Sequence, residues 1–172
     1  YGHKVVCTDY HNDLTKAQQL HQKHGVDHLV TYQKEDVSAI SFADNSLDVV
    51  VFKSVLGALN DKEKQETAYK ELHRVLKQGG VLLFAENLQA TKIHRYARDK
   101  FTTWGENWRY PTLCETKEMT SIFSEVKIKT YGFYGAFGRN EYQRRMIAPF
   151  DLMTSWAVPN SWNYIVFGAC IK

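Results

Sequence analysis

The feature that most constrains the fold of this chain is a set of short, largely apolar runs that recur along it. Residues 4–8, 47–52 and 81–85 each form such a run, and a charged residue follows each of them directly. Their apolar residues stand side by side instead of alternating with polar ones. A run of this kind is typical of a parallel strand that is buried on both faces. The chain is therefore expected to contain a parallel sheet.

The segment after the first run has the periodicity of an amphipathic helix. A helix from about Asp13 places Leu14, Ala17 and Leu20 on one face. Gly25 can end this helix in a left-handed conformation. The next strand is expected at residues 29–33.

A second helix is expected between the central run and the run at residues 81–85. Its cap is Asn60 or Asp61, and Gly79-Gly80 ends it. Its apolar stripe consists of Ala68, Leu72, Val75 and Leu76. Strands and helices in this order indicate a doubly wound, mostly parallel α/β sheet.

The pattern changes in the second half of the chain. Residues 91–104 are predicted to form a basic, aromatic helix, and residues 116–123 a shorter one. Residues 126–131 alternate in polarity and residues 162–171 are apolar, so both are predicted strands. No obvious crossover helix lies between them. An antiparallel pair at one edge of the sheet is expected.

Composition narrows the class of protein. A chain of 172 residues with 44% hydrophobic residues can bury one core, so a single domain is expected. Cys7, Cys114 and Cys170 are odd in number and far apart, which argues against disulfides, against a zinc site and for a reducing cytoplasm. The net charge of +3 is spread along the chain, so nucleic acid is not an expected partner. No apolar run is long enough for a membrane span, and the first residues do not resemble a signal peptide.

The ends of the predicted strands are the place to look for a ligand site, because ligands of open parallel sheets bind outside the carboxyl ends of the strands. Asp9 ends the first strand, where its carboxylate can accept two hydrogen bonds from a ribose diol. An acid at this point can equally be a helix cap. Asp9 alone therefore leaves both interpretations open.

Motifs further along the chain occur in a specific order. They read DVSAISF at 36–42, ADNSLDVV at 43–50, SVL at 54–56 and RVLKQGG at 74–80. In this order the sequence resembles the class I S-adenosylmethionine-dependent methyltransferases, in the small-molecule branch typified by quinone-biosynthesis enzymes. That family commonly reads D-x-x-x-L-P-F, D-x-S-F-D-x-V and R-V-L-K-P-G-G. The resemblance extends over residues 4–88 and implies a Rossmann-like methyltransferase sheet.

The resemblance implies S-adenosyl-L-methionine as cofactor and S-adenosyl-L-homocysteine as product. It also implies six cofactor-binding residues, which are Asp9, Tyr10, Asp36, Val37, Lys53 and Ser54. Asp9 would hold the ribose hydroxyls, and Asp36 would accept from the adenine amino group while the Val37 amide donates to the ring. Lys53 and Ser54 would line the methionine end. The alternatives are a turn residue at Asp36 and ordinary loop residues at 53 and 54.

The sequence departs from the family pattern at two positions and lacks one part of it. Ser41 and Gln78 stand where the family usually has proline, which affects turn stiffness more than chemistry. The family also begins with a strand and a G-x-G-x-G loop against the cofactor, and nothing in these residues supplies them. With that first strand and helix absent, we expect a sheet with a gap at its centre.

These observations predict one methyltransferase domain over residues 1–172, truncated at its N-terminus. Residues 1–88 would form the cofactor-binding core. Residues 89–160 would form substrate-cap insertions around a strand at 126–135, and residues 161–172 the last strand.

The expected reaction is in-line transfer of a methyl group to an oxygen, nitrogen or carbon atom of a small-molecule acceptor. Orientation of the acceptor supplies most of the rate, and a base helps where the acceptor is a hydroxyl. His94 and Tyr96 are the candidate catalytic residues, and the alternative is that both lie on a helix surface. Residues 104–111, rich in aromatics, are either a lid or packing over the sheet.

Two other functions remain open. The first is a catalytically inactive methyltransferase-like subunit that binds a partner protein, which the missing glycine loop would suit. The second is a short-chain NAD(P)-dependent dehydrogenase, because Tyr96 and Lys100 read Y-x-x-x-K. That family places a serine at a strand end about a dozen residues before the tyrosine, and residues 82–84 are Leu-Leu-Phe instead.

Overall fold

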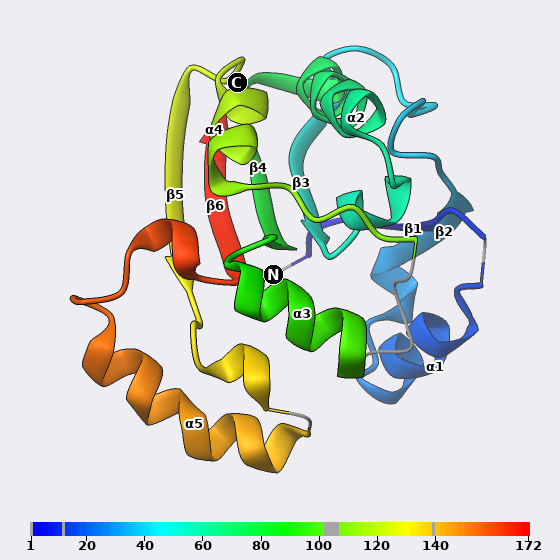
Figure 1. The fold of residues 1–172 in the computed structure, drawn as a ribbon. Coiled ribbons are helices and arrows are strands. Elements are labelled where there is room, and N and C mark those ends of the chain that lie inside the picture. The colour runs from blue at the N-terminus through cyan, green and yellow to red at the C-terminus, as the bar shows by residue number, and fades with distance from the viewer. Residues whose placement is uncertain (1, 12, 102–106, 139) are drawn as a thin grey trace.

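The strands that the structure describes form two separate sheets (Figure 1). The computed structural model describes residues 2–11, 13–101, 107–138 and 140–172. In the smaller sheet, β1 (Val5–Asp9) pairs in parallel with β2 (Val30–Lys34). The larger sheet has the order β3 (Leu47–Lys53), β4 (Leu76–Asn87), β6 (Ile165–Ile171), β5 (Glu125–Tyr131).

The pairing directions give the fold class. β3 and β4 are parallel, whereas β6 runs antiparallel to both β4 and β5. The predicted α/β sheet with an antiparallel edge pair is therefore confirmed. The gap expected at the centre of the sheet is also observed, since no ladder joins β1 or β2 to β3 in the described part of the chain.

Five α-helices of the described residues connect the strands. They are α1 (Thr15–Lys23), α2 (Lys62–Val75), α3 (Lys92–Phe101), α4 (Leu113–Thr120) and α5 (Glu141–Thr154). Four short 3₁₀ helices accompany them, namely η1 (Asp27–Leu29), η2 (Leu56–Leu59), η3 (Gly135–Phe137) and η4 (Asn160–Trp162).

Local sequence explains where the helices begin and end. Asp61 caps α2, because its carboxylate accepts from the Lys64 amide at 2.9 Å. Thr112 and Glu115 form a reciprocal capping box on α4. Gly25 follows α1 with a φ of +66°, the left-handed conformation predicted for it.

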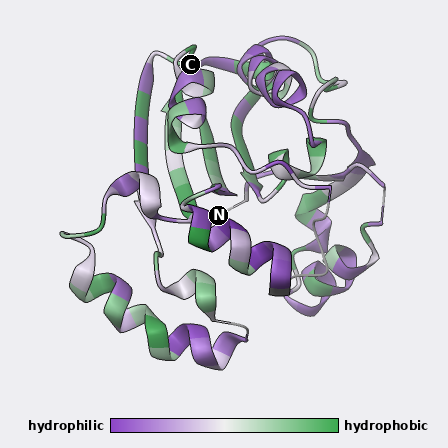
Figure 2. Cartoon of the chain, in the orientation of Figure 1, coloured by the Kyte–Doolittle hydropathy of each residue, from purple (hydrophilic) through white to green (hydrophobic). Residues whose placement is uncertain are grey.

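The hydrophobic core lies on one face of the larger sheet. Apolar side chains of α2, of α4 and of the loop after α4 pack against alternate residues of β4 and β6; they are Ala68, Tyr69, Leu72, Met119, Phe123, Leu82, Phe84, Val166 and Cys170. Figure 2 shows hydrophobic segments along β3 and β4, and alternation along β5. On β5, Ile128 packs against the core while Lys127 and Lys129 are exposed, as expected for a strand with one solvated face.

Burial of the first strands on both faces was a wrong expectation. Val5 and Val6 of β1 are exposed, and so are Val49 and Val51 of β3. Val51 keeps 69% of its surface exposed, because no strand pairs with that edge of β3 and no helix covers that face among the described residues.

The glycine pair does not end α2 as expected. The helix ends at Val75, and Leu76 already pairs with Leu47 in β4. The ladder then shifts register before Val81. Gly80 belongs to this irregularity, because a Cβ there would lie 2.8 Å from the Lys77 carbonyl oxygen.

Candidate functional site

The carboxyl ends of β1 and β2 bring the first two predicted cofactor residues together. Asp9 is the last residue of β1 and pairs with Lys34 at the end of β2. The Glu35 amide donates to the Asp9 carbonyl at 3.2 Å, so the loop that carries Asp36 leaves β2 next to Asp9. Both acids therefore lie on the same edge of the smaller sheet.

Asp9 uses one carboxylate oxygen to shape the turn that follows it. Its Oδ1 accepts from the amide of His11 at 2.8 Å and from that of Asp13 at 3.4 Å. Its Oδ2 has no recorded partner among the described residues. The neighbouring Tyr10 is 55% exposed, and the Lys34 ammonium lies 5.5 Å from its ring centroid. One acceptor of the Asp9 carboxylate thus remains available to a ligand.

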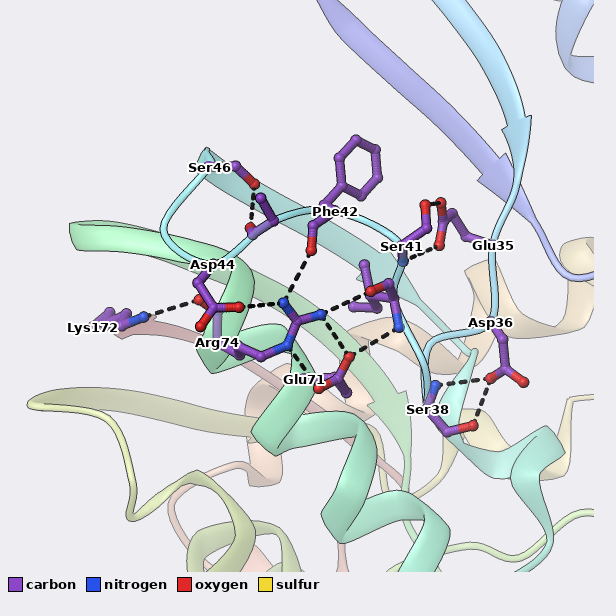
Figure 3. A network of polar contacts seen from close by, with 12 residues as sticks. Glu35, Asp36, Ser38, Ser41, Phe42, Asp44, Ser46, Glu71, Arg74 and Lys172 are labelled. Atoms are coloured by element: carbon purple, nitrogen blue, oxygen red, sulfur yellow. Dashed lines mark hydrogen bonds and ion pairs between the residues drawn. The ribbon is translucent and has the colours of Figure 1, made fainter.

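Asp36 has the same arrangement in the following loop (Figure 3). Its Oδ1 accepts from the Ser38 amide at 2.8 Å and from the Ser38 hydroxyl at 2.6 Å. These two bonds lower the pKa of Asp36, so the carboxylate is held ionised. Neither its Oδ2 nor the Val37 amide has a recorded partner in the part of the chain that the structure describes. Val37 itself packs against the core, which fixes the direction of its backbone.

Ser41 gives this loop a contact that a proline could not make. The Ser41 amide donates to Glu35 Oε2 at 2.9 Å, and its hydroxyl bonds to the other Glu35 oxygen. These bonds lower the pKa of Glu35 against the opposing effect of its burial. The departure from the family pattern at Ser41 is therefore compensated by a side chain that closes the loop.

Lys53 and Ser54 lie at the carboxyl end of β3, beside the end of β4. Lys53 is exposed and pairs with Ala85, and the Ser54 amide donates to the Ala85 carbonyl at 2.9 Å. Ser54 has a φ of +53°, a left-handed conformation that costs a residue with a Cβ about 1–2 kcal/mol. The chain therefore turns sharply at the point where β3 ends.

Glu86, at the end of β4, holds the loop after Ser54. Its Oε1 accepts from the Val55 amide at 2.5 Å and from the Leu56 amide at 2.9 Å. Glu86 is only 3% exposed, and burial raises the pKa of its carboxyl. Sequence reasoning missed this role. The signal in the sequence was an acid that directly follows an apolar run. In the fold this acid lies next to β3, and the loop after β3 supplies the backbone amides that it binds.

The two candidate catalytic residues point in different directions from α3. His94 is buried, with 2% of its surface exposed, whereas Tyr96 is 63% exposed. The Thr91 hydroxyl lies 2.7 Å from His94 Nδ1, and His94 Nε2 lies 2.8 Å from the Phe133 carbonyl, to which it donates. Burial lowers the pKa of His94. The structure therefore does not bring His94 and Tyr96 to one point.

Part of the aromatic segment at residues 104–111 can be located. Trp104 and its neighbours through residue 106 lie outside the described residues. The rest is anchored on η2 and α2: the Arg109 amide donates to the Gly57 carbonyl at 2.9 Å, and the buried Gln65 amide donates to the Arg109 carbonyl at 2.9 Å. The Trp108 ring packs so closely on Gly57 that a Cβ there would meet it at 2.7 Å. This stretch is packed against the body of the molecule.

Other kinds of site find no support in the described ranges. They contain no group of three or more histidine, cysteine, aspartate or glutamate side chains placed to hold a metal. None of their helices is long and apolar enough to cross a membrane. The Tyr96 hydroxyl lies 3.3 Å from the Lys100 ammonium, and both side chains are on an exposed part of α3.

Comparison with known proteins identifies a domain in the first half of the chain. Residues 1–84 match the family model described as a methyltransferase domain. A demethylmenaquinone methyltransferase of Bacteroides fragilis is 28% identical over 111 residues, which are 64% of this chain and 36% of that protein. The chain thus spans about a third of the length of this curated relative.

Solved structures share the fold at low sequence identity. A phosphoethanolamine N-methyltransferase 2 of Haemonchus contortus, in complex with phosphomonomethylethanolamine and S-adenosylhomocysteine, gives a TM-score of 0.66 at 16% identity. The match covers all of this chain and 44% of that one. The [4+2]-cyclase SpnF gives a TM-score of 0.62 at 15% identity, over 99% of this chain and 67% of the other. Similar folds therefore carry more than one activity.

Proposed function

Because this chain belongs, by its fold and by the domain match over residues 1–84, to the class I S-adenosylmethionine-dependent methyltransferases, we propose that the protein methylates a small-molecule acceptor. The observation that carries the proposal is the pair of strand-end carboxylates. Asp9 and Asp36 each have one oxygen fixed by the chain and one without a recorded partner among the described residues. Two such acceptors on one sheet edge suit a nucleoside.

The donor chemistry of these residues fits the cofactor of the family. The free oxygen of Asp9 would accept from a ribose hydroxyl. The free oxygen of Asp36 would accept from the adenine amino group, and the Val37 amide would donate to a ring nitrogen, because adenine offers that donor and acceptor side by side. Tyr10, next to Asp9, would cover one side of the nucleoside.

The loop after β3 would receive the methionine end. Lys53 and Ser54 begin this loop, and Glu86 fixes the amides that follow. S-adenosylmethionine supplies a methyl group on a sulfonium, whose thioether is a neutral leaving group. The protein's part would be to hold the acceptor in line with that methyl, since orientation alone can contribute about 7–11 kcal/mol.

His94 and Tyr96 stay the candidates for a general base. His94 could take a proton only after one of its two hydrogen bonds opens, because both ring nitrogens are engaged. Tyr96 is accessible, and its hydroxyl accepts a hydrogen bond from the Lys100 ammonium at 3.3 Å. Neither is needed where the acceptor atom is already a good nucleophile.

The class of methyl acceptor and the cellular compartment of the reaction are also part of the proposal. The Bacteroides relative is named for a quinone substrate, so a hydroxylated aromatic ring is the first acceptor class to test. Cys7, Cys114 and Cys170 are free thiols, which agrees with a cytoplasmic protein. The single-domain division, with a cofactor core over residues 1–88, a cap over 89–160 and a last strand over 161–172, is part of this proposal.

Titration calorimetry of the full-length protein with S-adenosylhomocysteine tests the function. The native protein should bind, and Asp9→Asn should weaken binding about tenfold or more, because an amide nitrogen replaces a carboxylate acceptor. The control is Asp13→Asn, an exposed acid in the same turn, which should bind normally. No detectable heat with the native protein would overturn the proposal that it is an enzyme. It would favour the catalytically inactive methyltransferase-like subunit that binds a partner protein. Equal binding by the Asp9 and Asp13 variants would show that the ribose site lies elsewhere.

A further inference from the structure

The segment that carries Asp36 and Val37 has no regular backbone hydrogen-bond ladder of its own. Residues 35–46 join β2 to β3 without a helix or a strand. Their backbone donors and acceptors therefore need partners elsewhere, because a buried backbone group without one is costly. Side chains of the loop bond the Ser38 and Ser41 amides, and the partners of Ile40 and Phe42 come from the last turns of α2.

Two side chains of α2 bind the backbone of this loop (Figure 3). Glu71 Oε2 accepts from the Ile40 amide at 3.0 Å. Arg74 donates through Nη2 to the Ile40 carbonyl at 2.7 Å and through Nη1 to the Phe42 carbonyl at 3.0 Å. Both polar groups of the Ile40 residue are thus satisfied by one helix.

The Arg74 guanidinium uses all five of its N–H donors. Besides the two carbonyls, it bonds to Glu71 through Nε and Nη2, each at 2.8 Å, and to Asp44 through Nη1 at 2.6 Å. Glu71 thereby has a lowered pKa, chiefly because of the Arg74 bond, so the pair is ionised. A lysine has three N–H donors on a single nitrogen atom, so it cannot reproduce the planar, forked arrangement of the guanidinium donors.

The bonds of Glu71 and Arg74 to the backbone of Ile40 and Phe42 form a clamp on this loop. The clamp lies close to Asp36 and Val37, the residues proposed to bind adenine. Ile40 packs against the core with Val37, three residues away, so the two ends of this short stretch are fixed from the same side. Asp36 is tied to Ser38, and Glu35 to Ser41, which leaves little freedom between β2 and the clamp. The stretch that carries Asp36 and Val37 is therefore constrained by its own side chains and, from Ile40 onward, by α2.

We propose that Arg74, together with Glu71, is a positioning residue for adenine recognition, because the pair clamps Ile40 and Phe42 and so holds Asp36 and Val37 in a binding conformation. This inference rests on the proposed function. It assigns Arg74 no contact with the cofactor. Its loss should reduce selectivity for adenine, in addition to any effect on folding.

The test compares two ligands on the full-length protein by calorimetry. S-adenosylhomocysteine carries the adenine amino group, and S-inosylhomocysteine carries an oxygen in its place. The native protein should prefer the adenine ligand at least tenfold. Arg74→Lys should lose about tenfold in affinity for S-adenosylhomocysteine and bring the ratio of the two affinities close to one. Glu71→Gln, a milder change, should move the ratio in the same direction.

Lys77→Met is the matched control. Lys77 lies just beyond α2 and makes an exposed ion pair with Asp48 at 2.7 Å, without a recorded contact to residues 35–42. Its removal should leave both affinities unchanged. Hydrogen exchange without any ligand gives a second readout. Amides 36–42 should exchange at least tenfold faster in Arg74→Lys, whereas those of β4 should be unaffected.

The outcomes separate this inference from the function. A native protein that binds neither ligand would overturn both. A native protein that binds the two ligands equally would leave a methyltransferase but remove the adenine role of Asp36 and, with it, the role of Arg74. A native preference that survives in Arg74→Lys, with unchanged exchange in residues 36–42, would show that Arg74 only stabilises the fold.

Discussion

At the scale of single residues, His94 offers the clearest dependence on pH. Burial lowers the pKa of its imidazole, so below about pH 6.5 the unfolded chain binds a proton that the folded protein does not. The stabilisation is present in full above the ordinary histidine pKa and is lost as pH falls through the lower folded value. The free energy of unfolding should therefore decrease on acidification, by at most about 1.4 kcal/mol per pH unit for this group.

Urea unfolding of the native protein and of His94→Gln between pH 5 and 8 isolates the contribution of His94 to the free energy of unfolding. Glu86 contributes with the opposite sign, because burial raises its pKa, and His73 with the same sign. Both cancel in the difference between the two proteins. That difference should shrink as pH falls. A constant difference for His94 would contradict the prediction, and normal turnover of His94→Gln would exclude it as the base.

Single residues also show what sequence can reveal about the site. Asp9 and Asp36 could be found because they follow strands directly and belong to ordered motifs. Glu86 and Arg74 act on loops that are distant in sequence, through 31 and 34 residues of separation from Val55 and Ile40. Only the packed fold brings them together, so the sequence could single out Glu86 as an acid after a strand but could not show which amides it binds.

At the scale of elements, α5 depends on one buried carboxylate. Asp151 is the buried residue of this helix and accepts from the amides of Phe133 and Tyr134 at 2.7 Å and of Gly135 at 2.8 Å. A Cβ at Gly135 would lie 3.0 Å from Asp151 Oδ2, so a larger residue there would make a tight contact with this carboxylate. The helix is therefore attached to η3 mainly by polar contacts.

Asp151→Asn should lower the free energy of unfolding by about 2 kcal/mol, because an amide nitrogen would face a backbone donor. Urea denaturation measures the change, and hydrogen exchange should show faster exchange in residues 133–138. Glu141→Gln, which removes an exposed ion pair with Arg144 on the same helix, should have no measurable effect. Equal stability of both variants would mean that α5 is held by something else.

Elements with a regular apolar pattern were predictable, and α5 was not. The stripe of α2 and the alternation of β5 gave their type and approximate position. In α5, Pro149 lies inside the helix and large apolar side chains face outward, among them Tyr142, Met146 and Leu152. A helix without a core-facing stripe has no periodic signal, so residues 141–154 were not expected to be helical.

At the scale of the whole molecule, the larger sheet has one covered and one open face. Val51 pairs with Leu83, and both side chains are exposed, as is Phe167 further across the sheet. Val50, between Val49 and Val51, points to the opposite face and packs against the core. In a doubly wound sheet both faces are normally covered. An exposed apolar sheet face of this kind favours association with other apolar surfaces.

The alternation along β3 makes this open face testable in the 172-residue chain. Val51→Lys should raise the monomer fraction, measured by size-exclusion chromatography with light scattering, because it places a charge on an exposed apolar surface. It should leave the free energy of unfolding nearly unchanged. Val50→Lys, one residue away, should lower that free energy by about 3 kcal/mol or more, since it buries a charge in the core. If Val51→Lys is as destabilising as Val50→Lys, the face is covered in solution, and the break in the sheet is closed by contacts other than those between the described residues.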